Sequence, residues 1–168
     1  MPMKTLLHQY ALYNLETNGL FGTMLGSIPD SVLNAEMKNS FPSIFKTYLH
    51  LLDVEAIWWQ RLQNQQSIIL PSVSFTGGIS ACNTAFKIQS QLWTNWILHA
   101  TEAELDQAIV FTNTDGVPVS QRISQVLIHL FSHQGYHRGQ IVTMLRQQGI
   151  TQNLPGAGFI DFVRADEE

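Results

Sequence analysis

The feature that most constrains the fold of this chain is the spacing of its apolar residues, which recur at intervals of three and four along several segments. This helical period predicts one helix over residues 4–24 and a second over 42–63, where a proline at the first helical position suits the geometry. Further helices are predicted from residue 83 or 84 to 99 and over 121–148, with Gly149 ending the last of them. Such a set of helices in a chain of 168 residues predicts an all-α four-helix bundle, whose facing helices can build a metal site.

The segments between these helices have the composition of loops and turns. Residues 26–43 are rich in Gly, Pro, Asp and Asn, which favours a loop with at most a weak helical turn, and residues 65–82 favour a long loop. Over residues 108–120, β-branched and aromatic residues flank the turn dipeptide Asp115-Gly116, which predicts a small, tight hairpin before the last helix. Ser120 is then the expected N-cap of that helix.

The length of the chain favours a single unit. A chain of 168 residues suits one domain with one sizeable core, and neither a repeat nor a linker divides it. We therefore expect residues 1–168 to form one domain. The tail over residues 151–168 contains Gly, Pro and an acidic end, and it is expected to wrap the surface before fraying.

The composition excludes several classes of function. Charged residues make up only 13% of the chain, and its nine Lys and Arg are scattered within a net charge of −4, so no basic stripe for nucleic acid is expected. No apolar run reaches the roughly 20 residues that span a bilayer. The single cysteine, Cys82, excludes an internal disulfide, and the first residues lack a signal-peptide core, so a cytoplasmic protein is expected. The low charge density also leaves a homodimer open.

Histidines form the main candidate site. His129, His133 and His137 are spaced four residues apart on the last predicted helix, so neighbouring members of the series lie on one face and can present imidazoles to one ion. All three cannot bind it comfortably, because residues 129 and 137 are about 12 Å apart along the axis. A further ligand must come from another helix, and His50, on an otherwise apolar stretch, is the candidate. A histidine-rich solvated face is the alternative that the spacing leaves open.

Three other residues are candidates for the surroundings of this site. Asp53 follows His50 by one turn and could accept a hydrogen bond from a ligand ring, although an exposed carboxylate is equally compatible with the pattern. Arg138 could pair with an anionic substrate or with a structural partner. Trp58 and the adjacent Trp59 point about 100° apart on a helix, so both cannot face the core, and one of them, Trp58, can line a pocket or an interface.

Two segments of the chain resemble a known family. HLFSHQGYHRGQIVTMLRQQG resembles the fourth-helix signature of the DinB-like (DinB/YfiT) proteins, and SIFKTYLHLLDVEAIWWQRL is similar to their second helix. The resemblance covers most of residues 1–150, although Tyr13 stands beside Asn14 where the family often carries Trp. It implies an up-down-down-up helix order and a divalent metal, such as zinc, nickel, manganese or iron, bound by His50, His133 and His137. His129 would then be a neighbour that supports a ligand or carries protons.

The expected function follows from an incomplete ligand set. Three imidazoles leave a coordination position open, which is typical of catalytic metal sites. The resemblance implies either thiol-dependent transfer or metal-dependent hydrolysis, so we expect a metal-dependent transferase or hydrolase that acts on a small-molecule substrate, with a low-molecular-weight thiol as one possibility. A non-catalytic metal-binding or dimerising bundle is the alternative. Because the histidines must be neutral to bind, metal is expected to be lost below about pH 6.

Overall fold

The fold is given by a computed structural model, which describes residues 1–65, 67–113, 115–156 and 158–165. Long helices packed side by side make up most of this part of the chain: α1 (Met3–Gly26), α3 (Ile44–Leu62), α5 (Ile79–His99) and α7 (Ile123–Gln147). Shorter elements lie between and after them: α2 (Asp30–Leu33), α4 (Pro71–Ser74), α6 (Glu102–Asp106), α8 (Phe159–Ala165) and the strands β1 (Ala108–Thr112) and β2 (Pro118–Arg122). The predicted all-α class is confirmed.

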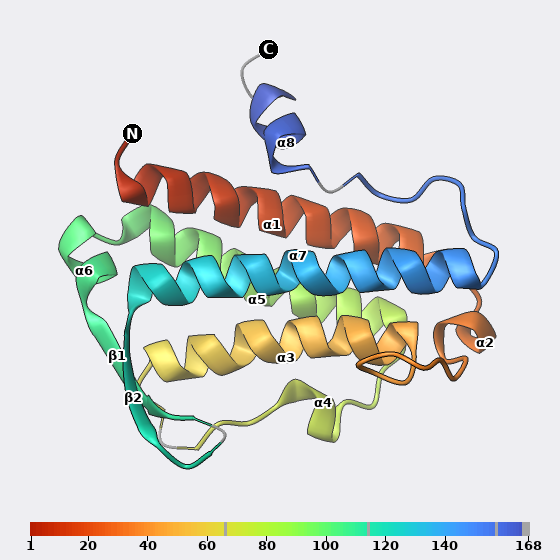
Figure 1. The fold of residues 1–168 in the computed structure, drawn as a ribbon, viewed down its shortest axis with the longest axis horizontal. Helices are drawn as coiled ribbons and strands as arrows, with labels where there is room; N and C mark the ends of the chain where they lie inside the picture. Colours follow the sequence, from red (N-terminus) through yellow and green to blue (C-terminus); the bar gives the residue numbers. More distant parts are fainter. Residues whose placement is uncertain (66, 114, 157, 166–168) are drawn as a thin grey trace.

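The long helices have the up-down-down-up order. In Figure 1, α1 and α7 run in one direction and α3 and α5 run in the other. Because α3 and α5 are parallel, the chain must return along the bundle between them, and α4 lies on that return path. Helix α1 packs mainly on α5, and α3 packs mainly on α7. The groove between α3 and α7 is therefore where two segments distant in sequence come together.

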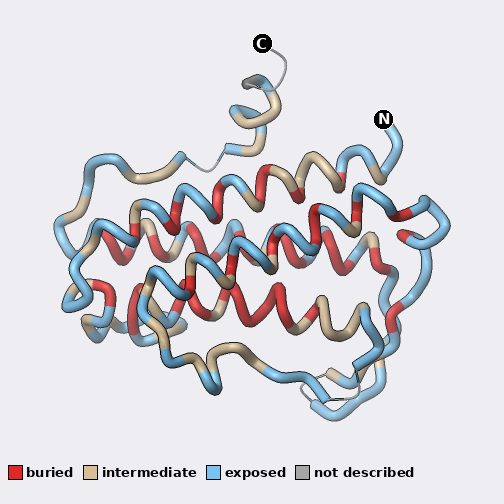
Figure 2. Tube along the Cα trace, turned by 180° about the vertical axis from the view of Figure 1, so that it is seen from behind, coloured by how far each residue is buried: buried red, intermediate tan, exposed pale blue. Residues whose placement is uncertain are grey.

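The core consists of two apolar clusters with a polar layer between them. One cluster lies toward the hairpin and contains Trp93, Leu127 and Phe131, and the other lies toward α2 and contains Phe21, Leu51 and Met144. Figure 2 shows that the buried residues lie along the long helices, while the hairpin and the tail are mainly exposed. Buried polar side chains occupy the level between the clusters, and we call them the core polar network: Asn14, Asn18, Glu55, Ser90 and Arg138.

The hairpin is confirmed as an antiparallel pair in which Ala108 lies opposite Arg122. Its connection spans residues 113–117, of which 114 lies outside the described part. The side-chain oxygen of Asn113 accepts hydrogen bonds from the backbone N–H groups of Asp115 (3.0 Å) and Val117 (2.9 Å). Gly116 has a φ of +78°, which suits glycine because L side chains rarely adopt that conformation. The turn therefore depends on Asn113 as well as on the expected Asp-Gly pair.

Several predicted boundaries need correction. Helix α5 begins at Ile79, earlier than residue 83 or 84, because Gly78 supplies the extended backbone before the first turn. The expected loop over residues 65–82 thus loses its last residues to α5 and also contains α4. Ser120 does not cap α7, because it lies in β2 opposite Val110, and Arg122 occupies the N-cap position instead.

The C-terminal end of α7 agrees with the prediction, and the tail differs from it. Gly149 follows the helix with a φ of +81°. The tail then forms the short helix α8, whose Phe159 and Phe162 rings pack on the Tyr13 ring at centroid distances of 5.5 and 5.8 Å. None of the helices in the described residues is both long enough and apolar enough to cross a membrane.

Candidate metal centre

The groove between α3 and α7 brings together three of the predicted site residues. The Nε2 atom of His133 lies 3.4 Å from Nε2 of His50 and 3.2 Å from Nε2 of His137. One ligand atom from each ring lies within 4.8 Å of the other two. Imidazole nitrogens from two distant parts of the chain therefore converge on one point.

Local contacts fix the two helices that carry these rings. Ser43 caps α3 by accepting a hydrogen bond from the backbone N–H of Lys46 at 3.2 Å. On α7, the buried side-chain amide of Gln134 donates to the backbone oxygen of Leu51 at 2.9 Å. Because Gln134 follows His133 and Leu51 follows His50, this bond ties the two helices together directly beside the rings.

The arrangement fits a divalent ion bound by nitrogen. In a tetrahedral site with metal–nitrogen bonds of 2.0–2.1 Å, neighbouring ligand nitrogens are roughly 3.3 Å apart. The distances from Nε2 of His133 to Nε2 of His50, 3.4 Å, and to Nε2 of His137, 3.2 Å, match that value. Nδ1 of His137 lies 2.7 Å from Oε1 of Gln140, whose amide nitrogen donates to Ser40 Oγ at 3.1 Å. An amide oxygen can only accept, so Nδ1 of His137 carries the proton and Nε2 has a free lone pair.

The rings are neutral near pH 7. Burial lowers the pKa of His50 to about 4, with a further lowering from His137 and a smaller opposing effect of Asp53. Burial likewise lowers the pKa of His133 to about 4, with further lowering from His137, His50 and His129. For His137, burial also lowers the pKa, and the hydrogen bond to Gln140 opposes this. Neutral imidazole is the form that binds metal ions.

We call His50, His133 and His137 the histidine cluster. An aromatic side chain covers this cluster at the end toward α2. The ring of Phe41 stacks on His50 at a centroid distance of 4.1 Å and meets His137 edge-on at 5.7 Å. Sequence reasoning missed both Phe41 and Gln140. Gln140 could have been found, because it lies one turn after His137 on the same face and belongs to the His-Arg-Gly-Gln run. Phe41 lies in a loop, and no local pattern places a loop residue against a particular ring.

His129 and Trp58 lie next to the cluster toward the hairpin. The His129 ring is 5.9 Å from the His133 ring, between centroids, and His129 is not part of the group of possible ligands. The Trp58 ring lies 5.9 Å from the His129 ring on the other side. The structure therefore places His129 between the possible ligands and Trp58.

The remaining two candidates have structural partners. Oδ1 of Asp53 accepts a hydrogen bond from the backbone N–H of Ser72 at 2.8 Å, which anchors α4. Arg138 is only 1% exposed and donates to the side-chain oxygens of Asn14 and Asn18, both at 2.9 Å. Arg138 thus points into the core polar network and does not line the histidine cluster.

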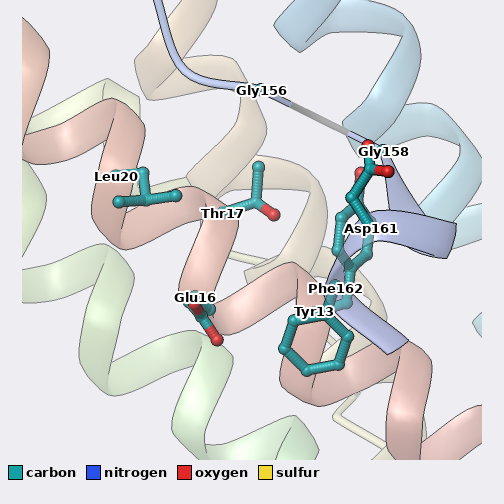
Figure 3. A pocket seen from close by; sticks show the side chains of 8 residues that line it. All are labelled: Tyr13, Glu16, Thr17, Leu20, Gly156, Gly158, Asp161 and Phe162. Atoms are coloured by element: carbon teal, nitrogen blue, oxygen red, sulfur yellow. The ribbon is translucent and has the colours of Figure 1, made fainter. Parts of the chain in front are cut away.

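Other cavities lie on the α1 side of the bundle. One of about 480 Å³ lies between α1 and α8, and Figure 3 shows its lining side chains, which include Tyr13, Glu16 and Phe162. A second, of about 750 Å³, lies along α1 and α5. Neither is lined by histidine, so the possible metal chemistry of the described residues is confined to the α3–α7 groove.

Comparison with known proteins agrees with this geometry. A sequence model described as the DinB family matches residues 1–157. The chain is also similar to Protein DinB of Bacillus subtilis (strain 168), with 23% identity over 163 residues, which cover 93% of this chain and 94% of that protein. The matched region includes His50, His133 and His137.

Proposed function

The chain belongs to the DinB family, and from this membership and its three convergent imidazoles we propose that it is a metal-dependent enzyme. The observation that carries the proposal is the spacing of the Nε2 atoms, 3.4 and 3.2 Å, which suits a single divalent ion. Three protein ligands leave at least one position for water or a reactant, as in catalytic zinc sites. Imidazole suits zinc, nickel and iron alike, and manganese is also a candidate, so the donor set does not select the ion.

A divalent ion in such a site acts as a Lewis acid and lowers the pKa of a water or thiol that binds to it. The residues around the site would orient the ligand rings and limit the access of water. Gln140 keeps the proton of His137 on Nδ1, so that the lone pair on Nε2 would be available to an ion. The Phe41 ring covers His50 and excludes water from that side. His129, which is exposed and lies next to His133, would take a proton on an imidazole nitrogen from a molecule bound in the site.

Two reaction types use these parts. In thiol-dependent transfer, an ion held by His50, His133 and His137 would lower the pKa of a low-molecular-weight thiol, His129 would take the proton, and the thiolate would displace a leaving group from an electrophilic small molecule. In hydrolysis, the same residues would activate water, which would displace the alcohol of an ester or the amine of an amide. Both need one activated nucleophile and one proton acceptor, and the three convergent imidazoles and the neighbouring His129 would meet these two needs.

Elemental analysis of untreated protein tests the metal-binding part of the proposal. We expect about one divalent ion per chain, with near-complete loss in His50→Ala, His133→Ala and His137→Ala. His99→Ala is the matched control, because His99 is exposed on α5 and its Nδ1 bonds within its own helix, to Asn95 O at 2.8 Å. Equal metal content in all of these variants would contradict the assigned ligands.

Activity measurements test the enzymatic part. Protein loaded with zinc, nickel or manganese is assayed with thiols plus electrophiles, and separately with panels of esters and amides. We expect turnover in one of the two assays that His133→Ala abolishes and His99→Ala retains. Protein that binds metal stoichiometrically and shows no turnover in either panel would support the non-catalytic alternative.

A further inference from the structure

A small pocket adjoins the histidine cluster on the side toward the hairpin. It has a volume of about 310 Å³ and is lined by Trp58 from α3, Gln121 from β2, and Gln125, Val126 and His129 from α7. This volume is at the lower limit of ligand pockets, about 300 Å³, so the pocket suits one ring-sized group. We infer that this pocket receives an aromatic ring of the molecule that occupies the open position of the metal centre.

The position of His129 connects the pocket to the cluster. Its ring is a wall of the pocket, and it lies 5.9 Å from Trp58 on one side and 5.9 Å from His133 on the other. At the opposite end of the cluster, Phe41 stacks on His50 at 4.1 Å and occupies the space beside it. A molecule held at the histidines can therefore extend past His129 into the pocket, whereas Phe41 blocks extension toward α2.

The walls of the pocket favour an aromatic group. The Trp58 indole and the His129 imidazole meet at an interplanar angle of 76°, and buried Val126 provides an apolar surface between the two helices. Aromatic rings prefer edge-to-face and offset-stacked contacts. Because the Trp58 and His129 rings are tilted relative to each other, they can offer a third ring one contact of each kind. The side-chain amides of Gln121 and Gln125 add neutral polar groups at the rim, and none of the lining side chains is an acid or a primary amine.

The Trp58 side chain is held in place before any ligand arrives. Its indole is 9% exposed and packs edge-on against Phe111 at 5.0 Å. The guanidinium carbon of Arg61 lies 4.6 Å from the centroid of the Trp58 ring and 4.2 Å from that of Phe111. A fixed wall binds a ring with little loss of side-chain entropy, which is a property of ligand sites.

Hydroxamates that differ in their side group test this inference, which rests on the proposed function because the hydroxamate must bind the ion. Cobalt(II)-loaded protein is titrated with acetohydroxamate, phenylacetohydroxamate and 3-phenylpropionohydroxamate, and binding is followed by the visible absorption of cobalt. The two phenyl compounds differ in length and so sample the distance from the ion to the pocket. We expect at least one of them to bind at least about tenfold more tightly than acetohydroxamate, which is about 1.4 kcal/mol.

Two variants assign this preference to the pocket. Trp58→Leu removes one wall, and Gln121→Trp, at an exposed strand position, fills the pocket from its rim. Both are expected to reduce the preference to less than about twofold while acetohydroxamate binding is unchanged. Trp96→Leu is the matched control, because Trp96 lies on α5 near a different cavity, and it is expected to keep the preference. Gln121→Trp preserves the test if Trp58→Leu does not fold.

The outcomes separate this inference from the proposed function. Wild-type protein that binds no cobalt, or whose cobalt spectrum does not respond to any hydroxamate, would overturn the proposed function and this inference with it. Equal binding of all three hydroxamates by wild-type protein would overturn the inference alone. A preference for a phenyl hydroxamate that persists in a folded Trp58→Leu or Gln121→Trp variant would also overturn the inference alone.

Discussion

Helix α7 contributes to two polar clusters that differ in how their polar atoms are satisfied. In the core polar network, Nη1 of Arg138 donates to Asn14 and Asn18, and the amide nitrogens of both asparagines donate to Oε1 of Glu55, at 2.8 and 3.1 Å. Ser90 donates to the other carboxylate oxygen at 2.9 Å. In the histidine cluster, ring nitrogens instead face one another across 3.2–3.4 Å.

The difference separates a structural cluster from one that could hold a metal ion. The network links a buried guanidinium to a buried carboxyl group through two amides, joins all of the long helices, and needs no further molecule to satisfy that carboxyl group. A cation between the histidines would accept all of their converging lone pairs at once. Adjacent residues of α7, His137 and Arg138, therefore serve different purposes, and substitutions should separate effects on stability from effects on metal affinity.

The largest expected effect is on stability and comes from Arg138→Leu. Removing the guanidinium leaves the side-chain oxygens of Asn14 and Asn18 without their donor and removes the charge that offsets part of the desolvation of Glu55, so the free energy of unfolding should fall by about 3–5 kcal/mol. Urea denaturation of the metal-free protein measures it. Arg146→Leu, at an exposed position on the same helix, should cost less than about 1 kcal/mol. Similar losses in the two variants would show that the network does not stabilise the fold.

A smaller effect, on metal affinity, is expected for Gln140→Leu. Without the Gln140 oxygen, the proton of His137 is no longer held on Nδ1, so metal affinity should fall about 10–100-fold. The free energy of unfolding of the metal-free protein should change by less than about 1 kcal/mol. Competition with a chromophoric chelator measures the affinity, and Gln147→Leu, exposed at the end of α7, is the control. If Gln140→Leu bound metal as tightly as wild-type protein, Gln140 would not have the assigned role of holding the proton of His137 on Nδ1.

The two clusters should also respond to pH with opposite signs in the metal-free protein. The folded pKa values of His50 and His133 are about 4, below the usual 6.5, so their contribution to stability is present above pH 6.5 and is lost as pH falls toward 4. Burial raises the pKa of Glu55 from 4.5 to about 7, so its contribution is present below pH 4.5 and is lost as pH rises through 7.

Glu55→Gln separates these contributions, because it removes the carboxylate titration and leaves the histidines in place. Urea denaturation between pH 4 and 7.5 should therefore show a steeper loss of stability on acidification in the variant than in wild-type protein. A parallel pH profile in the two proteins would contradict the opposing signs. The same low histidine pKa values indicate that proton competition should begin to weaken metal binding at a lower pH than for ordinary histidines.

Much of the fold could be predicted from the sequence because helical periodicity is a local signal. The long helices that this periodicity predicts and the up-down-down-up order that the family resemblance implies agree with the structure, and the largest errors lie at the helix ends. Residues 79–82 follow a Gly-Gly pair and have the composition of a loop, yet they form the first turn of α5 after its N-cap, Gly78. Ser120 has the side chain of a helix cap, yet strand pairing with Val110 places it in β2. In the second case a cross-strand contact outweighed the local preference.

The candidate site could be predicted only in part. The spacing of the α7 histidines and the lone His50 on α3 indicated which rings could meet, and the family resemblance chose the pair on α7. The core polar network could not be predicted, because Asn14 and Glu55 look like interruptions of apolar faces until helices distant in sequence bring them together. Asp53 lies one turn after His50 as expected, yet its Oδ1 accepts from Ser72, in a segment that was expected to be a loop.

The smallest expected effect is on metal affinity and comes from substituting His129, which lies just outside the histidine cluster. His129 lies on the same face of α7 as His133, with their rings 5.9 Å apart, but it is not part of the group of possible ligands. His129→Ala should therefore change metal affinity by no more than about twofold, the size of an ordinary surface substitution of about 0.5 kcal/mol. His133→Ala, measured in the same chelator competition, should lose binding almost completely. If His129→Ala also lost stoichiometric metal, the ion would lie one turn closer to the hairpin than the geometry of His50 and His137 indicates.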